Sequence, residues 1–183
     1  MLLLLSALVA GCDGAPAPAG SSPVSGATWD SADLVLSSQG LGAVRIGMNA
    51  YDAVRAAGIP ITVPDTPSAC QLYRPSAGDI RFPAWRVSDA GVVELVLSGG
   101  PLYGGGDFGR VRTADGLRVG DPLARVREVY GDRVVEQVDM FGTKRITASS
   151  GDGTALRFDA RADVIESMTG GTTAAIGFVE LCG

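Results

Sequence analysis

Two stretches of the chain match each other at a fixed spacing, and this repetition constrains the fold more than any other feature. The segment 44–58 corresponds to the segment 117–131, with glycines at 47 and 58 in the first and 73 positions later, at 120 and 131, in the second. In each copy a short apolar stretch runs to the first glycine, and a short helix is predicted between the two glycines. Similarity at a fixed period indicates a repeated structural unit.

The ends of both predicted helices carry the residue types that helix ends need. Asn49 followed by Asp52 approximates a capping box, in which side chains bond the free N–H groups of the first turn. Asp121 before Pro122 places an N-cap residue ahead of a proline at the first helical position. The glycine that closes each segment is a candidate left-handed C-cap.

Strands are predicted after each helix. The stretch 92–99 matches the stretch 164–170 at a shift of 72, and both follow a turn. Further strands are expected at Ile80–Val87, Val134–Val138, Thr143–Ser149, Ala155–Phe158 and Ile176–Leu181. The sequence therefore predicts an α+β protein of two tandem repeats, 30–103 and 104–183, each a short helix packed on a small antiparallel β-sheet.

The two matching segments also carry a resemblance. Gly-Met-Asn-x-x-Asp-x-Val at 47–54 and Gly-Asp-x-x-x-x-Val-x-x-x-Tyr-Gly at 120–131 resemble the helix entry of small envelope modules related to the outer-membrane assembly lipoprotein BamE and to the tandem-repeat β-lactamase inhibitory proteins. The resemblance implies that two copies set side by side form a concave sheet face that binds another protein. No functional residue of those families can be matched to a position in this chain.

The N-terminus is a run of apolar residues that ends in Val9-Ala10-Gly11-Cys12. The run is too short to span a bilayer and has the length of the apolar part of a secretory signal. The tetrapeptide resembles the lipobox of bacterial lipoproteins, in which the cysteine receives diacylglycerol and the bond before it is cleaved. The resemblance implies a signal peptide at 1–11 and a lipid on Cys12 that anchors the chain, outside the cytoplasm, to the cell membrane or outer membrane. The alternatives are a plain secretory signal and a buried apolar strand.

A segment rich in Gly, Ala, Pro and Ser follows Cys12. Its residues 13–27 lack the large apolar side chains that offset the entropy of ordering. The segment 12–29 is therefore predicted to be a disordered tether between the anchor and the folded part.

The other two cysteines, Cys70 and Cys182, lie in the part of the chain that is expected to fold. One cysteine at the N-terminus and a pair beyond it suit an oxidising compartment, so a Cys70–Cys182 disulfide is predicted. The bridge would join the C-terminal end to the first repeat. Free or metal-binding thiols are the alternative, although two cysteines without histidine make a poor zinc site.

Composition excludes several classes of function. The 183 residues include no histidine, which is the commonest general base and the commonest metal ligand. The net charge is −5, and the lysines and arginines are scattered, so the chain has no basic patch for a phosphate backbone. We therefore expect no enzymatic activity, no metal, no cofactor and no nucleic-acid partner.

The segment 98–109, which joins the two repeats, is a candidate binding loop. Six of its twelve residues are glycine, but it lacks the Gly-Lys-Ser or Gly-Lys-Thr ending of a phosphate-binding loop. It carries Tyr103 and Phe108, which are candidate contacts for a protein partner. The alternative is a flexible linker whose aromatic residues cover the edge of the core. Trp85 is a third candidate contact, with core packing as the alternative.

These features together predict a membrane-anchored extracytoplasmic lipoprotein that acts as a non-enzymatic protein-interaction module in the cell envelope. Its partners would be the membrane, through the lipid on Cys12, and a protein of the envelope. Two alternatives remain open. One is a histidine-free cell-wall enzyme that works with carboxylates, and the other is a lipoprotein that binds a small ligand or glycan through Trp85.

Overall fold

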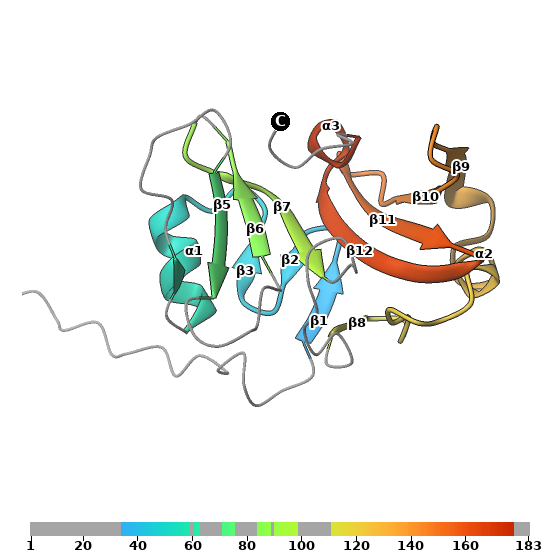
Figure 1. The fold of residues 1–183 in the computed structure, drawn as a ribbon. Helices are drawn as coiled ribbons and strands as arrows, with labels where there is room; N and C mark the ends of the chain where they lie inside the picture. The colour runs from blue at the N-terminus through green and yellow to red at the C-terminus, as the bar shows by residue number, and fades with distance from the viewer. Residues whose placement is uncertain are drawn as a thin grey trace, which may run out of the picture.

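The structure is a computed structural model, and it describes residues 34–58, 61–62, 71–75, 84–88, 90–98 and 111–177 (Figure 1). Within these ranges the fold is dominated by strands. The first half contains β1 (Leu34–Ser37), β2 (Gly40–Leu41), β3 (Val44–Arg45), α1 (Ala50–Ala57), β4 (Ile61–Thr62), β5 (Gln71–Pro75), β6 (Ala84–Val87) and β7 (Val93–Ser98). The second half contains β8 (Val111–Thr113), α2 (Ala124–Tyr130), the 3-10 helix η3 (Gly131–Arg133), β9 (Val134–Val138), β10 (Lys144–Ser149), β11 (Thr154–Arg161), β12 (Val164–Thr172) and α3 (Thr173–Ile176).

Eight of the strands form one continuous sheet. Their order is β4-β5-β6-β7-β12-β11-β10-β9, and each neighbouring pair is antiparallel. The second half thus repeats the order of the first in reverse, and the two halves meet where β7 pairs with β12. A second, smaller sheet has the order β3-β2-β1-β8, in which β8 of the second half lies parallel to β1 of the first.

The predicted fold class is wrong. The described part of the chain is mostly β-sheet with a few short helices, and it does not form two α+β units of a helix on its own sheet. The halves share the large sheet, and strands of both halves build the small one. The physical reason is that β7 and β12 would each leave a row of unpaired backbone groups if the halves were separate, and these rows satisfy each other.

The segments that match in sequence make matching backbone hydrogen bonds. The Gly47 N–H donates to the Val93 carbonyl at 2.8 Å, and the Gly120 N–H donates to the Ile165 carbonyl at 2.8 Å. Val93 and Ile165 each donate back to the residue that follows the glycine, at 2.7 and 2.9 Å. The start of each helix is thereby fastened to the strand that ends its own half of the chain, β7 or β12.

The two helices differ in how they begin. The Asn49 side chain accepts a hydrogen bond from the Asp52 N–H at 2.8 Å, so the predicted cap of α1 is confirmed. The predicted cap of the second helix is wrong. α2 begins at Ala124, and the Asp121 carboxylate instead accepts the Arg118 N–H at 2.9 Å.

The predicted strands are matched to different degrees. β9 has the predicted bounds, and β10 begins one residue later than predicted. The strand expected at Ile176–Leu181 is wrong at its first two residues, because Ile176 ends α3 and Gly177 follows it in a turn. The remainder, 178–181, lies outside the described residues.

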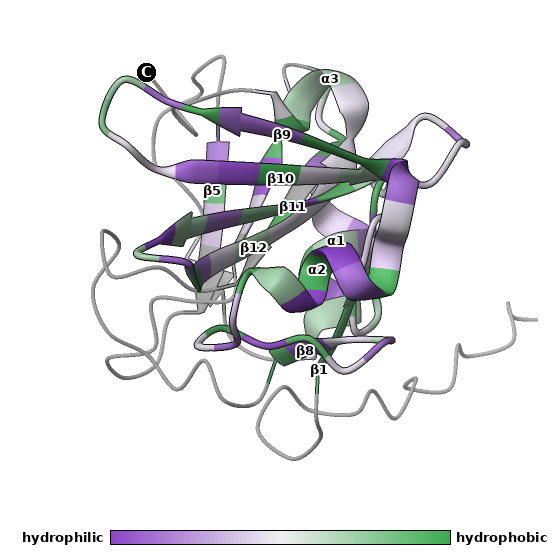
Figure 2. Cartoon of the chain, turned by 90° about the vertical axis from the view of Figure 1, so that its right-hand side faces the viewer, coloured by the Kyte–Doolittle hydropathy of each residue, from purple (hydrophilic) through white to green (hydrophobic). Residues whose placement is uncertain are grey.

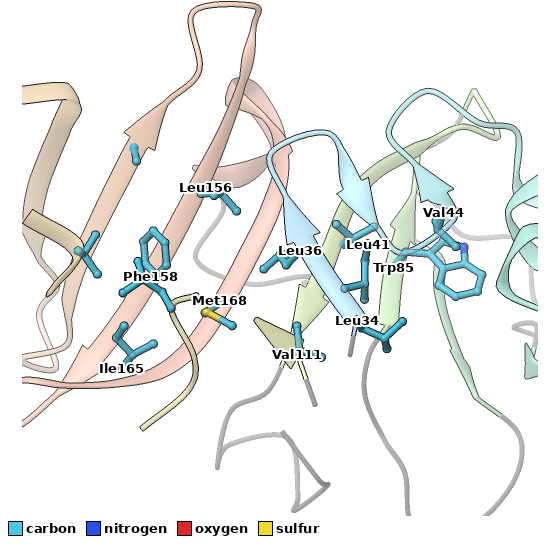
Figure 3. Close-up of a cluster of buried hydrophobic side chains, with 14 of the residues drawn as sticks. Leu34, Leu36, Leu41, Val44, Trp85, Val111, Leu156, Phe158, Ile165 and Met168 are labelled. Atoms are coloured by element: carbon cyan, nitrogen blue, oxygen red, sulfur yellow. The ribbon is translucent and has the colours of Figure 1, made fainter. Parts of the chain in front are cut away.

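One hydrophobic core lies between the two sheets and extends to α1 and α2. Leu36 and Leu41 of the small sheet lie between Phe158 and Met168 on one side and Trp85 on the other (Figure 3). The sheets approach so closely at Gly170 that a Cβ atom there would lie 2.1 Å from the Ser37 carbonyl oxygen. The small sheet therefore covers the line along which the two halves meet.

Candidate functional site

The large sheet has a second face, which points away from the core. Side chains alternate along a strand, so Phe158 of β11 faces the core while its neighbours Arg157 and Asp159 face the other way. The Arg157 guanidinium donates to the Ile176 carbonyl at 2.6 Å, which places α3 on this outer face. The outer face is the first place to search for a site.

Asp159 is the centre of a polar network on this outer face. Its two carboxylate oxygens contact the Nε atoms of Arg145 and Arg157 at 3.0 and 3.1 Å. The Ser167 hydroxyl donates to the same carboxylate at 3.1 Å. The three charged side chains are only 7 to 14% exposed. Buried charges are stable when they are paired and hydrogen-bonded. A structural role, the attachment of α3 to the sheet, is therefore enough to account for this network.

The other partly buried carboxylates of β7 and β12 are also paired with arginines. Glu94 lies 3.5 Å from Arg86, and Glu166 lies 3.6 Å from Arg161. Each of these acids, like Asp159, thus has an arginine partner in the described part of the chain. Within that part, no three Asp, Glu, Cys or His side chains come together in a way that could hold a metal ion.

A different feature stands out at the end of the sheet, in the turn between β9 and β10. The Asp139 N–H donates to the Thr143 carbonyl at 3.0 Å, and the Gly142 N–H donates to the Asp139 carbonyl at 3.0 Å. The Asp139 carboxylate accepts the backbone N–H groups of Phe141 and Thr143, both at 2.9 Å. These bonds, that from Thr143 foremost, lower the pKa of Asp139 below its usual value. The turn is therefore held in one shape by its own side chain.

This well-ordered turn presents large apolar side chains to solvent. Met140 is 91% exposed and Phe141 is 80% exposed. On the adjoining strand β9, Val135 and Val138 are each 62% exposed. Figure 2 shows the β9–β10 hairpin projecting from the molecule with a hydrophobic end. We call these four residues the β9 surface.

The other exposed aromatic residue of the described chain has different surroundings. Tyr51 of α1 is 72% exposed, and the Arg55 guanidinium lies 5.0 Å from the centre of its ring. An arginine over the ring face provides a polar cover for an isolated aromatic side chain. The β9 surface instead exposes four large apolar side chains within seven residues, with Val135 and Val138 on opposite faces of the strand, and such a density of exposed apolar groups indicates an interaction site.

The strand that carries this surface is also the last strand of its sheet. β9 pairs with β10 and, in the described residues, with no other strand. Edge strands usually carry lysine, proline or a bulge that prevents pairing with another chain. The sequence of β9, Val-Val-Glu-Gln-Val, contains neither lysine nor proline, and the charge of Glu136 is paired with Arg127 of α2.

Of the residues predicted to contact a partner, the structure describes Trp85. It is fully buried and stacks on Tyr73, with ring centres 5.9 Å apart. Trp85 therefore packs in the core and does not offer a surface for a protein or a glycan. Tyr103 and Phe108 lie outside the described residues, as do Cys12, Cys70 and Cys182.

Met140 and Phe141 were not among the predicted site residues. The sequence does contain a signal for them, because Asp-Met-Phe-Gly separates two predicted strands at 134–138 and 143–149. Turns of this kind normally hold small or polar residues. Two large apolar residues in such a turn are better explained by a binding role than by folding.

Comparisons with known proteins identify no relative of this chain. No family model, no curated protein and no solved structure matches the chain. Among the described helices, none has the length and apolar character needed to cross a membrane.

Proposed function

We propose that this protein is a membrane-anchored extracytoplasmic lipoprotein whose folded part is a non-enzymatic protein-interaction module of the cell envelope. The β9 surface is its binding surface. The proposed anchor is the lipid on Cys12, with the segment 12–29 as the tether. Two acyl groups or more on one cysteine suffice for stable anchoring, whereas a single chain does not.

One observation carries the proposed binding role: Met140 and Phe141 are exposed on a turn that is already ordered. An apolar side chain that becomes fully buried contributes about 1.5–3 kcal/mol. In this turn that free energy is not used in folding, so it is available for association. The bonds to Asp139 fix the turn beforehand, which reduces the entropy lost when a partner binds.

The binding role is tested by a photocrosslinking amino acid in place of Phe141, introduced in the full chain in its native membrane. The matched control places the same amino acid at Tyr51, which is also aromatic and exposed but lies on α1. We expect a defined adduct from position 141, none from position 51, and loss of the adduct when Met140→Ser is added. Equal labelling from both positions, or an adduct unaffected by Met140→Ser, would contradict the proposal.

The anchor is tested separately by metabolic labelling with a radioactive fatty acid. We expect the full chain to incorporate the label and to sediment with membranes. The Cys12→Ser variant should lose both properties. A labelled Cys12→Ser variant, or an unlabelled native protein with an intact leader, would show that the anchor is misassigned.

A further inference from the structure

The open edge of β9 identifies the kind of partner that this surface fits. We propose that two copies of this chain pair through antiparallel β9 strands around a two-fold axis at Gln137, which joins their eight-stranded sheets into one. The proposal rests on the proposed interaction role and names a second copy as the partner at the β9 surface.

The backbone of β9 has the groups that such a pairing needs. In an antiparallel pair, successive residues direct their N–H and C=O groups alternately toward one neighbour and the other. The Asp139 N–H donates toward β10, to Thr143. By this alternation Gln137 and Val135 also bond β10, whereas Glu136 and Val138 direct their backbone groups outward. In the described residues these outward groups face no other strand, so they can form hydrogen bonds with one.

Charge selects the register of the pairing. Two copies of β9 can be centred on Glu136 or on Gln137 while their outward backbone groups remain aligned. Centring on Glu136 places two glutamates directly opposite each other, and like charges in that position are destabilising. Centring on Gln137 places two neutral amides opposite each other, and each amide can both donate and accept a hydrogen bond. In this register Val138 lies opposite Glu136 of the second copy.

The same register covers part of the exposed apolar surface. Met140 lies three residues after the axis, and Val134 lies three residues before it. Met140 of each copy therefore comes to the level of Val134 of the other. Met140 is 91% exposed and Val134 is only half-buried, so both lose contact with water when the copies pair.

The charge pattern of the edge favours a second copy over a charged foreign strand. Glu136 is paired with Arg127 of its own chain, and the Asp139 carboxylate is engaged by backbone N–H groups. β9 itself contains no lysine or arginine that would attract an acidic segment, and these two acids are already engaged within their own chain. β9 of a second copy is a matching strand, because three of its five residues are valine and its one charged residue, Glu136, does not face its counterpart in the Gln137 register. If both copies are tethered to one membrane, their effective concentration rises as well.

The pairing is tested in the full-length protein, purified with its anchor in detergent, by disulfide trapping of Gln137→Cys. Directly opposite residues in this pairing have Cα atoms about 4.5 Å apart, which lies within the range that a disulfide spans. We expect a covalent dimer on mild oxidation. Ser149→Cys, on the neighbouring strand β10 and also exposed, is the matched control and should stay monomeric. The native protein, oxidised in the same way, shows whether its own cysteines form a covalent dimer.

A second measurement does not depend on trapping. Gln137→Lys places two like charges on the axis, whereas Ser149→Lys adds the same charge away from it. We expect Gln137→Lys to weaken dimerisation about tenfold or more, because like charges brought together at an interface are strongly unfavourable. Ser149→Lys should leave it unchanged, and both variants should keep the native circular dichroism spectrum. Sedimentation equilibrium over a range of concentrations measures the effect.

The outcomes separate this inference from the proposed function. A native protein that stays monomeric at every concentration, with no trapping at position 137, overturns the dimer. Trapping that is equal at positions 137 and 149 overturns it as well. If the chain is monomeric while the photocrosslinker at position 141 captures another protein, the dimer is wrong and the proposed function stands. If position 141 captures neither a second copy nor another protein, and position 137 gives no trapped dimer, both proposals fail.

Discussion

The centre and the edge of the eight-stranded sheet use apolar side chains in opposite ways. At the centre, where β7 pairs with β12, Val96 and Met168 are at most 1% exposed. At the edge, Val135 and Val138 of β9 are each 62% exposed, and the turn beyond them exposes Met140 and Phe141 still further. The formation of a core explains why the centre is apolar, but it does not explain the apolar residues at the edge. Binding to a partner explains them better than folding does.

The contrast between centre and edge is tested most directly by replacing one phenylalanine of each region with alanine. Phe158 is fully buried, with its ring centre 5.8 Å from that of Tyr130, and Phe158→Ala should lower the free energy of unfolding by about 3–5 kcal/mol. Phe141→Ala removes the same atoms from an exposed position and should change it by less than about 0.5 kcal/mol. Urea unfolding followed by circular dichroism measures both. Similar losses for the two variants would refute the contrast.

A smaller effect is expected where the two sheets approach most closely. Gly170→Ala puts a methyl group where a Cβ would lie 2.1 Å from the Ser37 carbonyl oxygen, so the small sheet must shift. We expect a loss of about 1–3 kcal/mol in the free energy of unfolding, as for other overpacked cores. Gly177→Ala is the control, because its added Cβ meets only ordinary contacts at 3.6 Å. If Gly170→Ala leaves the free energy of unfolding unchanged, the sheets are not in close contact there.

At the edge, removal of the Asp139 side chain should loosen the turn without unfolding the protein. Asp139→Ala deletes the acceptor of two backbone N–H groups, those of Phe141 and Thr143. We expect a global loss below about 1 kcal/mol but faster hydrogen exchange of these two amides. Asp139→Asn keeps an acceptor oxygen and should exchange more slowly than the alanine variant. An exchange rate unchanged in Asp139→Ala would show that the turn is ordered by something else.

The smallest expected effect concerns the contact between the two sheets at their turns. Asp152 accepts hydrogen bonds from Thr154 and from Gln39 of the small sheet, and these lower its pKa from 3.8 to about 2. Because the pKa is lower in the folded protein, the contribution of Asp152 to stability is present above pH 3.8 and is lost as the pH falls through about 2. A carboxylate titration by NMR measures this pKa. Thr154→Val should raise it toward 3.8, whereas a pKa that stays at about 2 would contradict the assignment.

Local structure was largely predictable from the sequence. The Asn49 cap of α1 and the bounds of β9 follow from capping chemistry and from the placement of apolar residues and turns. These signals depend on neighbours within a few residues. The choice of strand partners depends on the whole chain, and for that reason the pairing of β7 with β12 was missed and two separate units were expected.

The candidate site was less predictable than the fold. The sequence predicts Trp85 as a contact residue, but Trp85 is buried in the core. It does not predict Phe141, which is exposed to solvent. The sequence shows which residues are apolar, but the number of apolar positions that the core can accept depends on the three-dimensional packing. Only the structure shows that Met140 and Phe141 remain outside it.

The parallel pairing of β1 with β8 has a consequence for how the molecule loses its structure. Leu34 lies opposite Val111, so the first strand of one half is held by the first strand of the other. Neither half can melt without exposing the backbone and the core residues of its counterpart. Thermal denaturation should accordingly be one cooperative transition, and calorimetric and van't Hoff enthalpies should agree.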